Sequence, residues 1–156
     1  MISTSNYVVL KEGEGLRLNS GPGRDLIFKV TGEDTGGAFD QFIVQVAPRG
    51  GPPLHVHHHQ EETIQVLKGR YKIRIGEEIF YCDEGGFAYL PSKVPHAFLN
   101  LTDEGGEIIV VYTPGGGHKF YEELGPASRG GADRKAIAGI FEKYGMTLLG
   151  GPLTGD

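Results

Sequence analysis

Three histidines and one glutamate stand at spacings that suit a metal centre. His55 and His57 are separated by one residue, Glu62 follows shortly after, and His96 lies in a distant stretch of the chain. Imidazole nitrogens suit Zn, Cu, Fe and Ni, and a carboxylate adds a hard anionic oxygen. If the four side chains converge, the protein can hold one divalent transition metal (Fe, Mn, Ni, Cu, Co or Zn). The order of affinities does not decide which of these metals is bound in a cell.

Strand geometry decides whether these residues can meet. On a strand, His55 and His57 point to the same face because side chains alternate. Glu62 has the wrong parity for an unbroken strand, so a turn or bulge within residues 58–61 must reset the register. His96 is then expected to arrive from a distant strand, on the same face as Phe98 and Asn100. Four ligands from two sequence regions would meet inside a barrel, with one or two metal positions open to water or substrate.

The glycine content predicts an all-β protein. Twenty-six glycines punctuate short β-branched and aromatic runs in a chain of 156 residues, which is typical of a sandwich or barrel with frequent turns. The pattern is clearest over 70–75, where basic side chains alternate with Tyr71, Ile73 and Ile75 and are expected to face solvent. Strands are predicted near residues 7–10, 15–19, 25–31, 39–47, 54–57, 62–67, 70–75, 78–82, 87–90, 95–101 and 107–113.

Beyond residue 117 the hydrophobic period becomes helical. A short helix is expected over 119–124, stopped by Gly125 and Pro126, and a second over 133–144 with Asp133 as its N-cap. The chain is therefore expected to be a single domain, 1–156. Its barrel core would span about 25–115, and a C-terminal helical appendage would span about 118–156.

Two motifs in the chain resemble the signatures of the cupin superfamily. The first signature is a glycine, then HxH, glutamate and glycine, and His55, His57, Glu62 and Gly69 match it. Arg49 occupies the expected place of the opening glycine, and Gly50 and Gly51 follow it. The resemblance implies a jelly-roll barrel (a double-stranded β-helix) and metal binding by His55, His57, Glu62 and His96.

The second motif matches at Gly85, Pro91, His96 and Asn100, but Lys93 stands where glycine is usual. If that turn needs a positive φ, Lys93 costs on the order of 1 kcal/mol there; alternatively, the turn has another shape. Asn100 is expected to be a structural hydrogen-bonding residue. His58 and His59 are expected on the turn between the ligands.

Other segments resemble the quercetin 2,3-dioxygenase-like group within this superfamily: residues 32–37, 51–55 and 120–125. The resemblance implies a dioxygenase acting on a small, flat substrate with an enol or phenol oxygen, with dioxygen as co-substrate. Glu62 would be the catalytic residue, either remaining a ligand or accepting a substrate proton. The alternatives are a non-redox isomerase, lyase or cyclase, and a cupin that binds a small molecule without turnover. A homodimer is also implied, formed by an N-terminal strand that adds to the partner's sheet.

Composition excludes several other functions. The net charge is −5, and no long cluster of Lys and Arg appears, which argues against a nucleic-acid or membrane partner. A phosphorylated sugar would need an Arg or Lys inside the barrel, and the basic residues of 70–75 point outward. No signal peptide is visible, and the single cysteine, Cys82, is compatible with a reducing cytoplasm. Cys82 is expected to be an unreactive small hydrophobe.

The remaining hydrophobic residues are expected to form the core, and some of them to line a pocket on its inner face. His118, next to a glycine-rich stretch, is expected to be exposed, and the faces of Gln41 and Gln45 stay undecided. The expected core includes Phe42, Val44, Tyr71, Phe80, Tyr89, Phe98, Ile109 and Val111.

Overall fold

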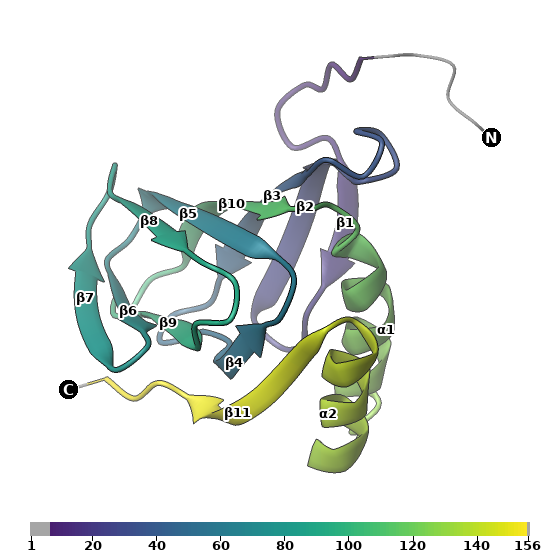
Figure 1. The fold of residues 1–156 in the computed structure, drawn as a ribbon. Coiled ribbons are helices and arrows are strands. Elements are labelled where there is room, and N and C mark those ends of the chain that lie inside the picture. Colours follow the sequence, from purple (N-terminus) through teal and green to yellow (C-terminus); the bar gives the residue numbers. More distant parts are fainter. Residues whose placement is uncertain (1–6, 156) are drawn as a thin grey trace.

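Two antiparallel sheets enclose the core of the protein, and two helices pack at one end of them (Figure 1). The computed structural model describes residues 7–155. The larger sheet has the order β1-β2-β3-β10-β5-β8, and the smaller has the order β11-β4-β9-β6-β7. The expected all-β jelly-roll barrel with short C-terminal helices is confirmed.

The elements follow one another as strands, then helices, then a last strand. They are β1 (Leu16–Asn19), β2 (Arg24–Val30), β3 (Asp40–Val46), β4 (Pro53–His57), β5 (Glu61–Lys68), β6 (Tyr71–Ile75), β7 (Glu78–Cys82), β8 (Phe87–Leu90), β9 (His96–Asn100), β10 (Gly106–Thr113), α1 (His118–Arg129), α2 (Arg134–Lys143) and β11 (Met146–Pro152). No helix in residues 7–155 is long and apolar enough to span a lipid bilayer.

Alternation along the central strands defines the inside of the barrel. On β3, Phe42, Val44 and Val46 are buried, whereas Gln41 and Gln45 lie on the opposite face. On β10 the buried residues are Ile108, Val110 and Tyr112. The prediction that Ile109 and Val111 belong to the core was wrong. Their neighbours face inward instead, because side chains alternate along a strand and a shift of one residue moves each of them to the other face.

Two further expectations about the core fail at the edges of the sheets. Phe80 on β7 is 46% exposed and Tyr89 on β8 is 49% exposed. Each lies on an edge strand, where neighbouring side chains cover it from one side only. Tyr71, on the more central β6, is buried as predicted. Residues 7–10 form no strand, contrary to expectation.

The C-terminal region departs most from the sequence-based prediction. α1 does not stop at Gly125 and Pro126 but runs through both to Arg129. A Cβ atom at Gly125 would collide with the backbone oxygen of Asn19, so this glycine lets α1 lie close to β1. α2 begins as predicted, because the Asp133 side chain accepts a hydrogen bond from the backbone N–H of Ala136 at 2.8 Å.

After α2 the chain forms β11, a strand that the sequence did not indicate. Met146 pairs with His57 of β4, and Leu148 pairs with His55. Figure 1 shows β11 running along the smaller sheet, next to β4. The C-terminal segment therefore lies beside the strand that carries the two histidines and is part of the barrel wall.

Candidate metal centre

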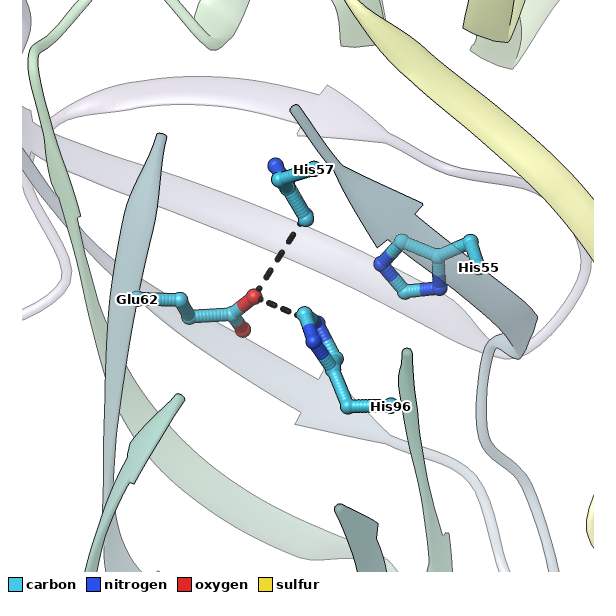
Figure 2. A group of neighbouring side chains, drawn as sticks. All are labelled: His55, His57, Glu62 and His96. Atoms are coloured by element: carbon cyan, nitrogen blue, oxygen red, sulfur yellow. Dashed lines mark hydrogen bonds and ion pairs between the residues drawn. The ribbon is translucent and has the colours of Figure 1, made fainter. Parts of the chain in front are cut away.

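The structure brings His55, His57, Glu62 and His96 to a common point inside the barrel (Figure 2). The first two lie on β4, Glu62 lies on β5 of the opposite sheet, and His96 opens β9. His55 and His96 are directly paired across β4 and β9. Residues 58–60 form the loop that resets the register, so that Glu62, Ile64 and Val66 all face inward, as predicted.

The four side chains are close enough to share one ion. Their ligand atoms all lie within 4.8 Å of one another, and all four residues are buried. Glu62 Oε2 lies 3.0 Å from His96 Nε2 and 3.6 Å from His57 Nε2. His57 Nε2 has no hydrogen-bond partner although it is buried. Buried polar atoms without partners are rare and costly, and a metal at this point would coordinate the free lone pair of His57.

Hydrogen bonds behind the ligands fix which ring nitrogen faces the centre. His55 Nδ1 lies 2.8 Å from the carbonyl of Pro53, which can only accept, so this nitrogen donates. His57 Nδ1 lies 2.9 Å from Gln60 Oε1, and Gln60 Nε2 donates to the carbonyl of Pro114 at 2.9 Å. In both histidines the Nε2 lone pair is thereby left for a metal. Gln60 could not be identified from the sequence, since its role depends on a contact with the distant Pro114.

Burial keeps the imidazoles in the form that binds metals. Desolvation lowers the pKa of His55 well below its ordinary value, and His96 and His57 lower it further. Desolvation, with His96 as the next cause, lowers the pKa of His57 to about 3. Both rings are therefore neutral at pH 7, and no proton has to be displaced when a metal binds them. Three imidazole nitrogens and one carboxylate oxygen fit a divalent transition metal.

A small cavity of about 40 Å³ lies beside the four residues and reaches His55 and Glu62. Its walls are mostly apolar and include Phe42, Val44 and Phe98, three expected core residues that also line the cavity. Besides His55 and Glu62, the polar part of the wall is formed by Ser20, Arg24, Tyr112 and Tyr121.

The polar wall holds two residues that the sequence analysis did not consider. Arg24, the first residue of β2, stands inside the barrel, and Tyr121 reaches the cavity from α1. The hydroxyls of Tyr112 and Tyr121 lie 2.7 Å apart. Desolvation raises the pKa of both phenols well above the ordinary value. The outward basic residues of 70–75 were therefore not a sufficient reason to exclude a cation from the barrel.

Both departures from the cupin-like motifs keep the backbone shape that glycine favours. Arg49 has a φ of 57° and Lys93 has a φ of 69°. The turn at Lys93 thus has the positive φ that was one of the two alternatives. The backbone N–H of Lys93 donates to the carbonyl of His57 at 2.7 Å, so this turn holds β4 in place.

Residues near the centre fall into structural roles. The Asn100 side chain donates to the carbonyl of Glu104 at 2.9 Å and accepts from the backbone N–H of Thr102 at 3.0 Å. His58 contacts Thr147 on β11, and His59 is exposed; neither belongs to the group of four. The expectation for His118 was wrong: it is only 4% exposed, because α1 carries it against the barrel beside Phe28.

Comparisons with known proteins agree with this geometry. Residues 42–112 match the family described as Cupin domain, and this range contains all four residues of the centre. Quercetin 2,3-dioxygenase of Bacillus subtilis is 29% identical over 90 residues, covering 58% of this chain and 26% of that protein. An uncharacterized protein of Methanocaldococcus jannaschii is 31% identical over 71 residues, covering 46% of this chain and 57% of that protein. The chain thus spans less than two thirds of either relative.

Solved structures share the fold at low sequence identity. KdgF from Halomonas sp. superimposes with a TM-score of 0.63 at 14% identity, covering 74% of this chain and 99% of that chain. The polyketide cyclase RemF from Streptomyces resistomycificus gives a TM-score of 0.58 at 18% identity, covering 69% of this chain and 79% of that chain.

Proposed function

We propose that this protein, whose residues 42–112 match the Cupin domain family, is a metal-dependent dioxygenase acting on a small, flat substrate with an enol or phenol oxygen. The observation that carries this proposal is the convergence of three imidazoles and one carboxylate beside a mostly apolar cavity. The similarity to a quercetin 2,3-dioxygenase over 90 residues supports the same reaction class.

His55, His57, Glu62 and His96 would hold one divalent metal (Fe, Mn, Ni, Cu, Co or Zn). When bound there, such a metal supplies Lewis-acid chemistry and, if it is redox-active, electron transfer to dioxygen. The apolar walls formed by Phe42, Val44 and Phe98 bind a flat ring and exclude water from it.

Glu62 is the residue placed to move a proton. Its Oε2 lies 3.0 Å from His96 Nε2, and its side chain lines the cavity in which the hydroxyl of a substrate would lie. A carboxylate within hydrogen-bond reach of that hydroxyl can accept its proton as general base. The neutral Tyr112 hydroxyl, on the strand paired with β5, remains a hydrogen-bond donor to the substrate.

Oxygen uptake tests the proposal. Protein reconstituted separately with Fe, Mn and Ni is given quercetin and smaller enol- and phenol-bearing compounds. Consumption of dioxygen in step with loss of substrate is the expected result, and Glu62→Gln should lower the rate while keeping substrate binding. No uptake with any metal, together with a product formed under anaerobic conditions, would overturn the dioxygenase assignment.

A second function has one observation in its favour. A non-redox isomerase, lyase or cyclase could use the same four residues, and the expected lack of a cation inside the barrel had argued against a phosphorylated-sugar substrate for it. Arg24 lies in the cavity wall and supplies one cation there, which suits a substrate with a single negative charge. The anaerobic arm of the oxygen experiment separates this function from the first, and binding without any turnover would indicate a cupin that only holds its ligand.

We further propose that the protein is located in the cytoplasm and forms a homodimer. Support for the dimer comes from exposed apolar side chains before β1, such as Tyr7 at 77% and Val9 at 87%. β1 is an edge strand of the larger sheet, to which a partner's strand can add. Light scattering should give the mass of two chains for the full protein, and a monomer after deletion of residues 1–10; a full-length monomer contradicts the proposal.

A further inference from the structure

Arg24 is directed into the barrel by the alternation of β2. It shares its face with Leu26 and Phe28, which are both buried in the core. Its neighbour Asp25 faces the other way and accepts a hydrogen bond from Asn19 at the surface. Arg24 therefore places a guanidinium at the mouth of the inner face, where the cavity begins.

The guanidinium of Arg24 has no counter-ion in the part of the chain that the structure describes. Its one side-chain hydrogen bond runs from Nη2 to the carbonyl of Ser20 at 3.3 Å, and no ion pair joins it to a carboxylate within residues 7–155. Arginine carries five N–H donors in a rigid fork, so most of them remain free. A cation that is partly removed from water without an anion is costly, and burial lowers the pKa of Arg24 accordingly.

Tyr112 and Tyr121, which line the cavity together with Arg24, offer a further hydrogen-bond donor. The hydroxyls of Tyr112 and Tyr121 make one hydrogen bond to each other, which uses one of their two protons. Both phenols are neutral at pH 7, as ordinary tyrosines are. One hydroxyl proton is therefore left to donate to a ligand in the cavity that both residues line with Arg24.

The same cavity connects this donor cluster with the candidate metal centre. Arg24, Tyr112 and Tyr121 line it together with His55 and Glu62. A ligand of modest size can then place one group at Arg24 and another at the four residues of the centre. Arg24 is the only Lys or Arg in the lining, so the cavity neutralises one negative charge of a ligand. A phosphate dianion would require more cationic side chains than this wall has.

We propose that Arg24 binds a carboxylate of the substrate, assisted by the free hydroxyl proton of the Tyr112 and Tyr121 pair. The substrate class is therefore a small, flat acid whose carboxylate lies at Arg24 and whose enol or phenol oxygen faces Glu62 and the histidines. This inference rests on the proposed function only in taking this cavity as the substrate site. It narrows the substrate class from flat molecules with an enol or phenol oxygen to those that also carry one carboxylate.

Binding to a redox-inert form of the protein tests this inference without any turnover. Calorimetric titration of Zn-loaded protein with 2-, 3- and 4-hydroxybenzoate is compared with titration by the matching hydroxybenzamides, which keep the ring and the hydroxyl but lose the charge. The wild-type protein should bind at least one acid more tightly than its amide. Arg24→Gln should weaken binding of that acid by about 10- to 100-fold, because charge-assisted hydrogen bonds are lost, and should change the amide affinity by less than about twofold.

Two further variants make the result specific. Arg17→Gln removes the same charge from an exposed position on β1 and should leave both affinities unchanged. Arg24→Lys keeps the charge but loses the fork, so its loss for the acid should be intermediate. Zinc content must equal that of wild type in every variant.

The proposal is overturned if wild type binds no acid more tightly than its amide, or if Arg24→Gln weakens both ligands equally. The comparison of acid and amide in wild type needs no variant, so it holds even if Arg24→Gln does not fold. If the acids are preferred but dioxygen is never consumed, the reaction assignment fails and the Arg24 assignment stands. If dioxygen is consumed with neutral substrates alone, the Arg24 assignment fails and the reaction assignment stands.

Discussion

Gln60 offers a sharp test of the candidate metal centre, because it lies outside the four ligands yet fixes one of them. The carbonyl of Pro114 can only accept, so it orients the amide of Gln60. Gln60 Oε1 then faces His57 Nδ1 at 2.9 Å and makes that nitrogen the donor. Replacing Gln60 by alanine leaves a buried N–H on His57 without an acceptor, at a cost of about 1–3 kcal/mol.

The expected effect on the metal follows from this arrangement. Without the acceptor, His57 can turn or change tautomer, and its Nε2 is no longer held towards Glu62. Loss of such an outer hydrogen bond typically weakens metal binding by about 10- to 100-fold. Competition with a chromophoric chelator measures the zinc affinity directly. Gln60→Glu keeps an acceptor for His57 and should retain most of the affinity, although it loses the bond to Pro114.

Gln65→Ala is the matched control, because Gln65 is an exposed glutamine on the outer face of β5. It should leave the zinc affinity unchanged. If Gln60→Ala binds zinc as tightly as wild type, within about twofold, the hydrogen bond does not orient His57, and the tautomer argument is wrong. Equal losses in Gln60→Ala and Gln60→Glu would instead assign the effect to the contact with Pro114.

Three further predictions follow from the same structure. His57→Ala should abolish metal occupancy in elemental analysis while circular dichroism still reports a β-rich fold; full occupancy in this variant contradicts the ligand assignment. Metal-free protein should lose stability as the pH falls from about 6.5 towards 3, since the pKa of His57 is about 3 in the folded state against an ordinary 6.5. In that interval only the unfolded chain binds a proton at His57, which lowers the free energy of unfolding by roughly 1.4 kcal/mol per pH unit. Denaturant midpoints that do not change between pH 7 and 5 would refute this prediction. Lys93→Gly should raise the free energy of unfolding by up to about 1 kcal/mol because it relieves a φ of 69°, whereas Lys93→Ala should not; equal midpoints for the two would show that the turn is unstrained.

The ligand positions could be predicted because strand parity is a local property. His55 and His57 share a face by their spacing alone, and the position of Glu62 required a reset that the loop at residues 58–60 provides. Parity also placed Tyr71 correctly. It failed for Ile109 and Val111, because both faces of β10 carry apolar residues and the alternation then gives no direction.

The rest of the site depends on contacts between distant segments, which no local pattern encodes. Gln60 matters because its side chain contacts Pro114, and Arg24 matters because β2 places it in the cavity wall. Pro126 lies inside α1 although proline commonly ends helices. Gly125 is required because the backbone oxygen of Asn19 on β1 leaves no room for a Cβ atom. In each of these cases the tertiary packing overrides the preference of the individual residue.

The distribution of the site along the chain separates its chemistry from its selectivity. All four residues of the candidate metal centre lie within 42–112, the range that matches the Cupin domain family. The remaining polar wall of the cavity lies partly outside that range: Arg24 precedes it, and Tyr121 on α1 follows it. A fold of this kind supports many functions, because the segments that line the cavity can vary while the centre stays the same. We therefore expect β2 and α1, which carry Arg24 and Tyr121, to select the substrate, rather than the four central residues.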